Sequence, residues 1–441
     1  MRKVAIIGTV GVPAAYGGFE TLVENIIGEN CSQGIEYTVF CSSKDCSERL
    51  SEYKGAKLRY VPIKANGIWS IIYDGVSLMK SLWRYDVVVV LGVSGGVFFP
   101  LFRLLCRSRF IVNIDGLEWK RAKWSKPTKL FLRFCEEIAL RISDVVIADN
   151  QGIVDYVHRR YKKKTVLIAY GSDHVVREVS DRRTAEILDS YGIEKGAYAI
   201  SVCRIEPENN CDVILGAFCK SGQPLIFIGN WEKSDYGAGL KAHYSRFGNI
   251  TIVDALYDLD TLHVLRTNCK YYMHGHSAGG TNPSLVEAMS SQCNVVAFDV
   301  VYNRETTENS AIYFKDEAEL INIITRADNY AENGNSEKMF EIASRRYTWR
   351  VIAKQYESLF APPPPKCEEQ YVNRWGRLTF SSVLDKKFLS KTQAISYKPL
   401  YYYYFCFLAT IASITATAAI FMMSLTELSI SVKCTGLFNP I

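Results

Sequence analysis

Short apolar runs alternate with amphipathic stretches from Met1 to Phe360. A short apolar run that ends near a glycine, such as Val4–Gly8, is typical of a strand buried on both faces of a parallel sheet. The stretch that follows, Phe19–Asn30, carries apolar residues at helical spacing. Because this alternation repeats along the chain, it predicts βαβ units and parallel sheets covered by helices.

The same patterns set the expected elements. The predicted strands are Val4–Gly8, Tyr37–Cys41, Leu58–Val61, Val87–Leu91, Phe110–Ile114, Val145–Ala148, Val166–Ile168, Tyr198–Val202, Leu225–Gly229, Ile250–Val253, Tyr271–Met273, Val295–Phe298 and Ile312–Phe314. The predicted helices lie near Phe19–Asn30, Ile71–Leu82, Phe98–Cys106, Lys129–Ile142, Gly152–Arg160, Asp181–Tyr191, Gly239–Phe247, Asp260–Asn268, Pro283–Ser291 and Ala343–Phe360. Ligands bind at the carboxyl ends of such strands, so the loops there are the candidate sites.

The segment His274–Met289 joins a predicted strand to a predicted helix through a Gly-Gly-Thr-Asn turn at 279–282. Adjacent glycines let a backbone come close to a ligand. The helix that begins at Pro283 presents free N–H groups and a partial positive charge, which suits a diphosphate. Glu287 lies one turn into this helix, where a carboxylate can accept hydrogen bonds from sugar hydroxyls. A plain tight turn is the alternative interpretation.

The loop after the first predicted strand runs from Thr9 to Gly18. A strand, a glycine-bearing loop and a helix form a cradle for a phosphate or another ligand. Its glycine spacing is not Gly-x-Gly-x-x-Gly, which disfavours a dinucleotide site. Glu20 is a candidate ligand contact here, with a carboxylate stabilised by the helix dipole as the alternative.

Asp115 directly follows the predicted strand Phe110–Ile114. A carboxylate at this place can orient or deprotonate a hydroxyl group of a ligand, so Asp115 is a candidate base or anchor for an acceptor. A turn residue of an Asp-Gly pair is the alternative. Lys120 and Arg121 interleave with tryptophans. This pattern is typical of a site that binds acceptor phosphates or a membrane surface, and a solvated basic face is the alternative.

Arg204 follows the predicted strand Tyr198–Val202 and can neutralise a diphosphate, although a surface ion pair is the alternative. His274 and His276 lie two residues apart near the end of a strand, where one of them is a candidate donor contact. A metal pair is not expected without further ligands.

Composition narrows the class of protein. The chain has 441 residues, 48% hydrophobic and 22% charged, which is enough for two domains with proper cores. A net charge of +6 is compatible with anionic substrates or an anionic membrane surface and is too small to indicate nucleic acid. The 13 cysteines show no Cys-x-x-Cys pair, so we expect reduced thiols rather than disulfides or zinc. No N-terminal signal peptide is expected.

The stretch Leu400–Leu425 has no charged residue and is long enough to span a bilayer as a helix. Basic residues precede it, so the positive-inside rule predicts that the domains before it are cytoplasmic. A re-entrant or interfacial helix is an alternative because threonine and serine lower its hydropathy, and a buried core helix is a further one.

Several strings together resemble family-4 glycosyltransferases, and in particular a subgroup described as rhamnosyltransferases. They are Pro-x-x-Tyr-Gly-Gly-Phe-Glu at 13–20, Asp-Gly-x-Glu-Trp-Lys-Arg at 115–121, the hinge string at 169–174, the arginine loop at 203–210 and Ser-x-Gly-Gly-Thr-Asn-Pro-Ser at 277–284. Glu287 matches the second of two family glutamates, whereas Gly279 replaces the first. Asn209 replaces a family lysine.

The resemblance covers roughly Met1–Phe360 and implies an α/β protein of the GT-B fold, with two Rossmann-like domains facing a cleft; the hydropathy of Leu400–Leu425 adds a C-terminal hydrophobic helix. The expected parts are an acceptor domain at 1–175, a nucleotide-sugar donor domain at 176–345, a cross-back helix and proline linker at 346–365, a basic juxtamembrane segment at 366–399 and a transmembrane helix at 400–425. The expected location is the cytoplasmic face of the cell membrane.

The implied activity is transfer of a hexose or deoxyhexose such as L-rhamnose, with retention, from a dTDP- or UDP-linked sugar to a polyprenyl-linked glycan in surface polysaccharide synthesis. No cofactor, metal or nucleic acid is expected. Asp115 and Glu287 are the expected catalytic residues. The expected donor-binding residues are Arg204, His276, Gly279, Gly280, Thr281, Asn282 and Glu287, and the expected acceptor or phosphate loop residues are Tyr16, Gly17, Gly18, Glu20, Glu118, Lys120 and Arg121. The alternatives are an NAD-dependent oxidoreductase and a catalytically weak, membrane-anchored partner of another transferase.

Overall fold

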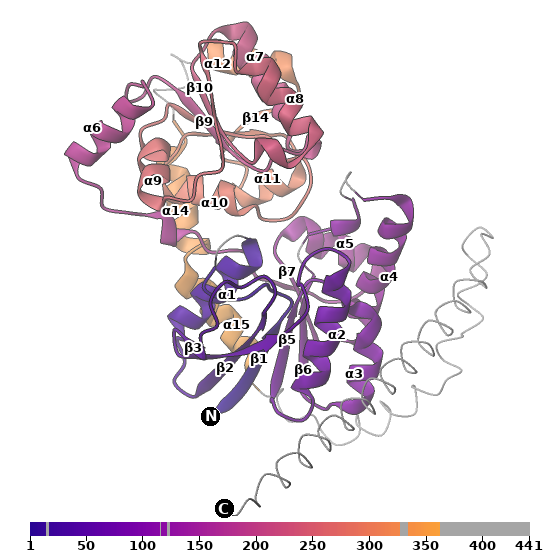
Figure 1. The fold of residues 1–441 in the computed structure, drawn as a ribbon. Coiled ribbons are helices and arrows are strands. Elements are labelled where there is room, and N and C mark those ends of the chain that lie inside the picture. The colour runs from indigo at the N-terminus through magenta and orange to yellow at the C-terminus, as the bar shows by residue number, and fades with distance from the viewer. Residues whose placement is uncertain (15–16, 115, 121–123, 327–333, 362–441) are drawn as a thin grey trace, which may run out of the picture. The chain divides into compact units, whose positions relative to one another are not determined.

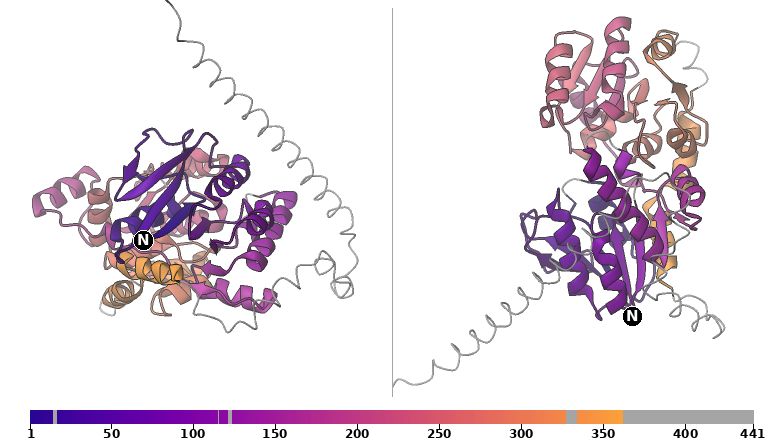
Figure 2. Two further views of the ribbon diagram at one scale, coloured as in Figure 1. Left: turned by 90° about the horizontal axis from the view of Figure 1, so that it is seen from below. Right: turned by 90° about the vertical axis from the view of Figure 1, so that its right-hand side faces the viewer.

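The computed structural model describes residues 1–14, 17–114, 116–120, 124–326 and 334–361, which form two separate sheets with flanking helices (Figure 1). Helices lie on both faces of each sheet (Figure 2). The fold is therefore of the doubly wound α/β type that the alternation of the sequence predicts.

The first sheet has the strand order β3-β4-β2-β1-β5-β6-β7-β8, and all its pairs are parallel except β3–β4. Its strands are β1 (Arg2–Ile7), β2 (Ile35–Ser42), β3 (Glu52–Tyr53), β4 (Ala56–Val61), β5 (Val87–Leu91), β6 (Arg109–Asn113), β7 (Val145–Ala148) and β8 (Val166–Leu167). Its helices are α1 (Gly18–Glu29), α2 (Trp69–Ser81), η1 (Gly96–Phe98), α3 (Phe99–Leu105), η2 (Glu118–Lys120), α4 (Lys126–Ile142) and α5 (Gln151–Tyr161), and η3 (Asp173–Val175) lies in the connection to the second sheet.

The second sheet has the order β11-β10-β9-β12-β13-β14 and is parallel throughout. Its strands are β9 (Ala199–Val202), β10 (Leu225–Ile228), β11 (Ile250–Val253), β12 (Tyr271–His274), β13 (Val295–Phe298) and β14 (Ile312–Phe314). Its helices are α6 (Asp181–Ser190), η4 (Pro207–Asn209), α7 (Cys211–Ser221), η5 (Trp231–Lys233), α8 (Asp235–Tyr244), α9 (Leu259–Thr267), α10 (Pro283–Ser290), α11 (Val301–Thr306), α12 (Glu317–Thr325) and α14 (Ser336–Arg346).

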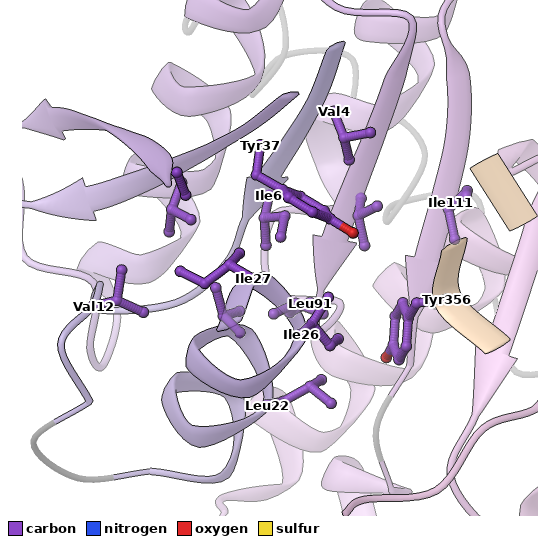
Figure 3. Packing of buried hydrophobic residues seen from close by; sticks show 14 of the residues in the cluster. Val4, Ile6, Val12, Leu22, Ile26, Ile27, Tyr37, Leu91, Ile111 and Tyr356 are labelled. Carbon is purple, nitrogen blue, oxygen red and sulfur yellow. The ribbon is translucent and has the colours of Figure 1, made fainter. Parts of the chain in front are cut away.

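The last described helix, α15 (Trp349–Phe360), packs on the first sheet although it follows the second. Tyr356 lies in the same buried cluster as Leu91 of β5 and Ile26 of α1 (Figure 3). The amide of Asn113 donates a hydrogen bond to the Tyr356 hydroxyl at 2.7 Å. The chain therefore returns to the first sheet after completing the second.

The structure also corrects several expectations. The stretch Ala343–Phe360 is not one helix, because α14 and α15 are separate and Tyr347-Thr348 lies between them. Pattern reading missed β3, α7, α11 and α12. It also placed α8 at Gly239–Phe247, whereas Ser234 caps a helix that begins at Asp235.

Among the residues that the structure describes, no helix is long and apolar enough to cross a bilayer. The predicted membrane helix Leu400–Leu425 lies outside these residues. It therefore stays a prediction, as does the basic segment 366–399 before it.

Candidate functional site at the strand ends

Strand order marks one ligand-binding edge in each sheet. In the first sheet the order reverses between β1 and β5, and in the second it reverses between β9 and β12. Ligands of open α/β sheets bind at such switch points, outside the carboxyl ends of the strands. In the second sheet these ends carry the Arg204 loop and the glycine turn, the two motifs that the sequence singled out.

The loop from Gly275 to Asn282 connects β12 to α10. Gly279 has a φ of +127°, a backbone conformation that side chains rarely adopt. Asn282 caps α10, because its side-chain oxygen accepts hydrogen bonds from Ser284 N at 3.2 Å and Ser284 Oγ at 3.0 Å. The turn and cap thus present the start of α10, with its partial positive charge, beside the glycines.

The Arg204 loop interlocks with this glycine loop. The amide of Asn210 donates to the carbonyl of Gly275 at 2.8 Å, and Ser277 donates to the carbonyl of Glu208 through both its backbone N–H and its hydroxyl. A side chain at Gly275 would come within 2.2 Å of the carbonyl oxygen of Asn209. The two loops therefore form one rigid edge.

Two residues of the Arg204 loop have opposite environments. Arg204 is half-buried, and its guanidinium makes no hydrogen bond or ion pair with any residue that the structure describes. Asn209 is buried, and its amide donates to the carbonyl of Arg204 at 2.7 Å. Asn209 thus holds the loop through its amide, and it contributes no positive charge there.

Two histidine rings stack at the end of β12. His274 and His276 are both buried, with ring centroids 4.4 Å apart and an interplanar angle of 10°. Burial lowers the pKa of His274 to about 3, so this ring is neutral at physiological pH. The amide of Asn303 donates to the carbonyl of His276 at 2.9 Å and fixes the start of the glycine loop.

Glu287 projects from α10 into an ion pair. Its carboxylate accepts a hydrogen bond from Arg266 Nη2 at 2.6 Å and lies 3.8 Å from His174 Nε2. Arg266 is only 1% exposed, whereas the Glu287 side chain is 18% exposed. Glu287 therefore compensates a buried charge, while its side chain stays partly exposed.

His174 connects Glu287 to Trp349, the first residue of α15. The indole N–H of Trp349 donates to His174 Nδ1 at 2.9 Å, so the proton of the neutral ring is on Nε2, facing Glu287. Burial lowers the pKa of His174, which favours this neutral form. The predicted hinge string at 169–174 is thus joined to the predicted donor glutamate.

The loop after β1 is held by Glu20. This buried carboxylate accepts hydrogen bonds from Thr9 Oγ1 at 2.9 Å and Val10 N at 2.8 Å. Gly17 has a φ of +127°, and a side chain there would come within 2.0 Å of a Glu20 carboxylate oxygen. Glu20 therefore organises its own loop.

Three loops of the first sheet come close to the glycine loop of the second. A Cβ atom on Gly280 would lie 2.0 Å from Asp149 Oδ1, and one on Gly116 would lie 3.4 Å from Gly279. A Cβ atom on Gly18 would lie 3.9 Å from Pro283 Cγ. Glycine is required at position 280, because a side chain there would clash with the Asp149 carboxylate, whereas the distances at Gly116 and Gly18 are ordinary van der Waals contacts.

Asp149 and Asn150 are the site residues that sequence reasoning missed. The hydroxyl of Thr281 donates to the carbonyl of Asp149, and all of Thr281, Asp149 and Asn150 are buried. Asn150 caps α5 and donates to the carbonyl of Tyr302 at 3.2 Å and to Glu305 Oε2 at 3.0 Å. The available signal was a polar pair directly after the apolar run of β7.

The predicted acceptor residues are only partly described. Glu118 accepts a hydrogen bond from the indole of Trp124 at 3.1 Å, and the Lys120 ammonium lies 5.8 Å from the ring centroids of both Trp119 and Tyr156. Tyr16, Asp115 and Arg121 lie outside the described residues. Their predicted roles therefore stay predictions.

Taken together, the edge of the second sheet offers a helix N-terminus, an arginine and close-approach glycines, a set that can hold a diphosphate. A family model described as "Domain of unknown function (DUF1972)" matches residues 1–173. No match was found among curated proteins.

Solved structures share the architecture. Sucrose-phosphate synthase from Thermosynechococcus elongatus is 17% identical, with a TM-score of 0.68 over 82% of this chain and 98% of that chain. HepE from Anabaena in complex with UDP and glucose is 16% identical, with a TM-score of 0.65 over 81% and 98%. An α,α-trehalose-phosphate synthase (UDP-forming) from Burkholderia xenovorans is 13% identical, with a TM-score of 0.61 over 82% and 100%. These likenesses establish an α/β GT-B-like fold for this chain.

Proposed function

We propose that the chain is a glycosyltransferase that moves a hexose or deoxyhexose from a nucleoside-diphosphate sugar to an acceptor. The observation that carries this proposal is the interlocked edge of the second sheet. There Arg204, which no described residue pairs, follows β9, and the capped start of α10 follows β12 at the same switch point. Complexes of HepE with UDP, with UDP and glucose and with UDP-glucose support a nucleotide-sugar donor.

The proposed chemistry follows from the charges. As the bond between sugar and diphosphate breaks, negative charge builds up on the leaving diphosphate. Arg204 and the N-terminus of α10 stabilise that charge, and the Glu287 carboxylate accepts a hydrogen bond from a hydroxyl of the donor. Asp115 orients or deprotonates the acceptor hydroxyl.

The finer proposal concerns the substrates. We propose L-rhamnose from a dTDP- or UDP-linked donor, a polyprenyl-linked glycan as acceptor, and retention of configuration, all on the resemblance of the strings at 13–20 and 277–284 to the rhamnosyltransferase subgroup. Membrane attachment through Leu400–Leu425 belongs to the same proposal.

The first test is thermal stabilisation of the purified full chain by UDP, dTDP, GDP and NAD in parallel. A ligand that binds only the folded state raises the melting temperature. We expect one nucleoside diphosphate to give a shift that Arg204→Gln abolishes, with Lys195→Gln as an exposed control. A shift with NAD alone would overturn the proposal in favour of an oxidoreductase.

The second test separates an active enzyme from a catalytically weak partner. The departures at Gly279 and Asn209 motivate that alternative. We expect the purified chain to hydrolyse or transfer the sugar of the donor whose nucleoside diphosphate it binds. Binding without any turnover, in the presence of lipid-linked acceptor, would favour the partner role.

A further inference from the structure

A groove on the first sheet lies away from the proposed donor site. It has a volume of about 560 Å³ and runs between β4 and the carboxyl end of α2. Leu58, Tyr60 and Met79 give it an apolar lining, while Arg59, Lys80 and Arg84 line it with positive charge. A groove with this combination fits a ligand that is apolar in one part and anionic in another.

The apolar surface continues from the groove onto α3. Trp83 is 76% exposed, and its indole donates to the carbonyl of Leu105 at 2.8 Å, which ties the end of α2 to the end of α3. Leu104 is 72% exposed, and Leu101 and Leu105 are exposed beside it. Helices α2 and α3 lie on one face of the first sheet (Figure 1). Contiguous exposed apolar side chains of this size mark interaction surfaces.

The backbone of Trp83 adopts a strained conformation. Trp83 has a φ of +56°, in the left-handed region that bulky residues avoid. A glycine or asparagine would adopt this conformation more readily. Backbone strain persists where the surrounding structure imposes it, and it clusters at functional segments. Here it places the largest exposed ring of the surface between the groove and α3.

Within the described part of the chain, the exposed cations of this surface are not paired with acidic side chains. Arg59, Lys80, Arg84 and Arg107 are all exposed, and none forms an ion pair with any residue in the described part of the chain. Arginine and lysine near an anionic leaflet bind its lipid headgroups, and tryptophan prefers the level of those headgroups. Leucines beside them can enter the acyl region.

We propose that this α2–α3 surface, formed by the groove residues, Trp83 and the exposed leucines of α3, docks on a bilayer that contains anionic phospholipid. A second copy of the chain is a poorer occupant, because a symmetric contact would oppose the same four cations. The surface is separate from the strand-end site, so the proposal does not depend on the identity of the donor.

The test is photocrosslinking of the full chain on vesicles. A benzophenone amino acid replaces Leu104, and a control variant carries it at Val301, which is 58% exposed on α11. Vesicles contain either phosphatidylcholine alone or phosphatidylcholine with phosphatidylglycerol. We expect lipid adducts at position 104, mainly with phosphatidylglycerol present, and few at position 301. Adducts at position 104 no more frequent than at 301 would overturn the proposal.

Charge variants of the crosslinking protein test the role of the cations. Each of Lys80→Gln and Arg84→Gln is expected to lower the adduct yield at position 104 by about fivefold. The reason is that each Lys or Arg near an anionic membrane surface strengthens binding by about that factor. Lys195→Gln, an exposed lysine of the second sheet's domain, should leave the yield unchanged. Equal yields in both lipid mixtures would overturn the anionic preference, and adducts to another copy or to residues 362–441 would assign the surface to that occupant instead.

Discussion

The loops at the strand ends are held in different ways in the two sheets. In the first sheet buried carboxylates do it: Glu20 holds Thr9 and Val10, and Asp74 accepts a hydrogen bond from Ser94 at 2.7 Å. In the second sheet neutral groups do it: the amides of Asn209, Asn210 and Asn303 hold the Arg204 and glycine loops, and neutral His274 lies beneath them.

This difference separates the two halves electrostatically. A carboxylate that tied down the glycine loop would repel a diphosphate at close range, whereas an amide supplies the same hydrogen bonds without charge. The carboxylate that does stand on α10, Glu287, is balanced by the buried Arg266. Within the second sheet these loops are therefore held without added negative charge, although the Asp149 carboxylate of the first sheet lies beside Gly280.

The largest expected effect on stability comes from breaking the ion pair between Glu287 and Arg266. Glu287→Ala would leave Arg266 as a buried, uncompensated charge, so we predict a loss of about 3–5 kcal/mol in the free energy of unfolding. Burial alone would lower the pKa of Arg266, and the Glu287 carboxylate raises it above its ordinary value. Denaturant unfolding measures the loss, and Arg266→Met combined with Glu287→Leu should recover most of it. A Glu287→Ala loss below about 1 kcal/mol would contradict the assignment.

The second prediction compares a buried titrating group from each half. Burial raises the pKa of Asp74 to about 7 from 3.8, so between these values the folded state holds a proton that the unfolded state lacks, and stability falls as pH rises. Burial lowers the pKa of His274 to about 3 from 6.5, so the unfolded state holds the extra proton, and stability falls as pH drops.

Between about pH 4 and 6.5, Asp74 and His274 change the free energy of unfolding with pH in opposite directions, each by about 1.4 kcal/mol per pH unit. Relative to the unmodified chain, Asp74→Asn should therefore lose stability on acidification over this window, and His274→Phe should lose it as the pH rises. Urea unfolding across the window measures both. Parallel pH profiles for the two variants would contradict the comparison.

The third prediction concerns the loop after β1. Glu20→Ala removes the acceptor for Thr9 and Val10 and leaves buried donors unsatisfied, so we expect a loss of about 2 kcal/mol. Glu20→Gln keeps one acceptor oxygen and should cost about half as much. Thermal or denaturant unfolding separates them. Because glutamine keeps both the volume and one acceptor oxygen, equal losses would mean that the negative charge of Glu20 matters rather than these two hydrogen bonds.

The smallest expected effect on stability is that of Arg204→Ala. Because no described residue pairs with its guanidinium, unfolding free energy should change by no more than about 0.5 kcal/mol. Binding of the nucleoside diphosphate, measured by calorimetry, should weaken about tenfold or more, as expected for loss of a charge-assisted contact. A large stability loss with unchanged binding would make Arg204 a structural residue.

Much of the fold followed from local patterns. Buried strands such as β5 and β7 have continuous apolar runs, and their predicted bounds agree with the structure. Helix α7 was missed because Cys211–Ser221 is apolar over most of its length and lacks clear helical periodicity. The break at Tyr347-Thr348 was missed because helical residues flank it on both sides, and the contacts that interrupt the helix come from distant residues.

The site was less predictable than the fold. Motif strings located the Arg204 loop and the glycine turn, since glycine, arginine and a helix start are visible in sequence. The partners Arg266 and Asp149 were not visible, because each lies far along the chain from the residue that it contacts. The burial of Asn209 was equally hidden, since only the folded loop shows where its amide points.

The chain passes between the two sheets twice, at 169–175 and at 346–349, and the two passages are bonded to each other. Ser172 N donates to the carbonyl of Tyr347 at 2.7 Å, and Trp349 N donates to Asp173 Oδ1 at 2.7 Å. A single connecting segment would leave the two domains free to rotate about it in any direction. Two connecting segments that are hydrogen-bonded to each other favour bending about one axis and resist twisting. Any opening of the edge around Gly280 should therefore follow one defined path, with the pair of Trp349 and His174 near its pivot.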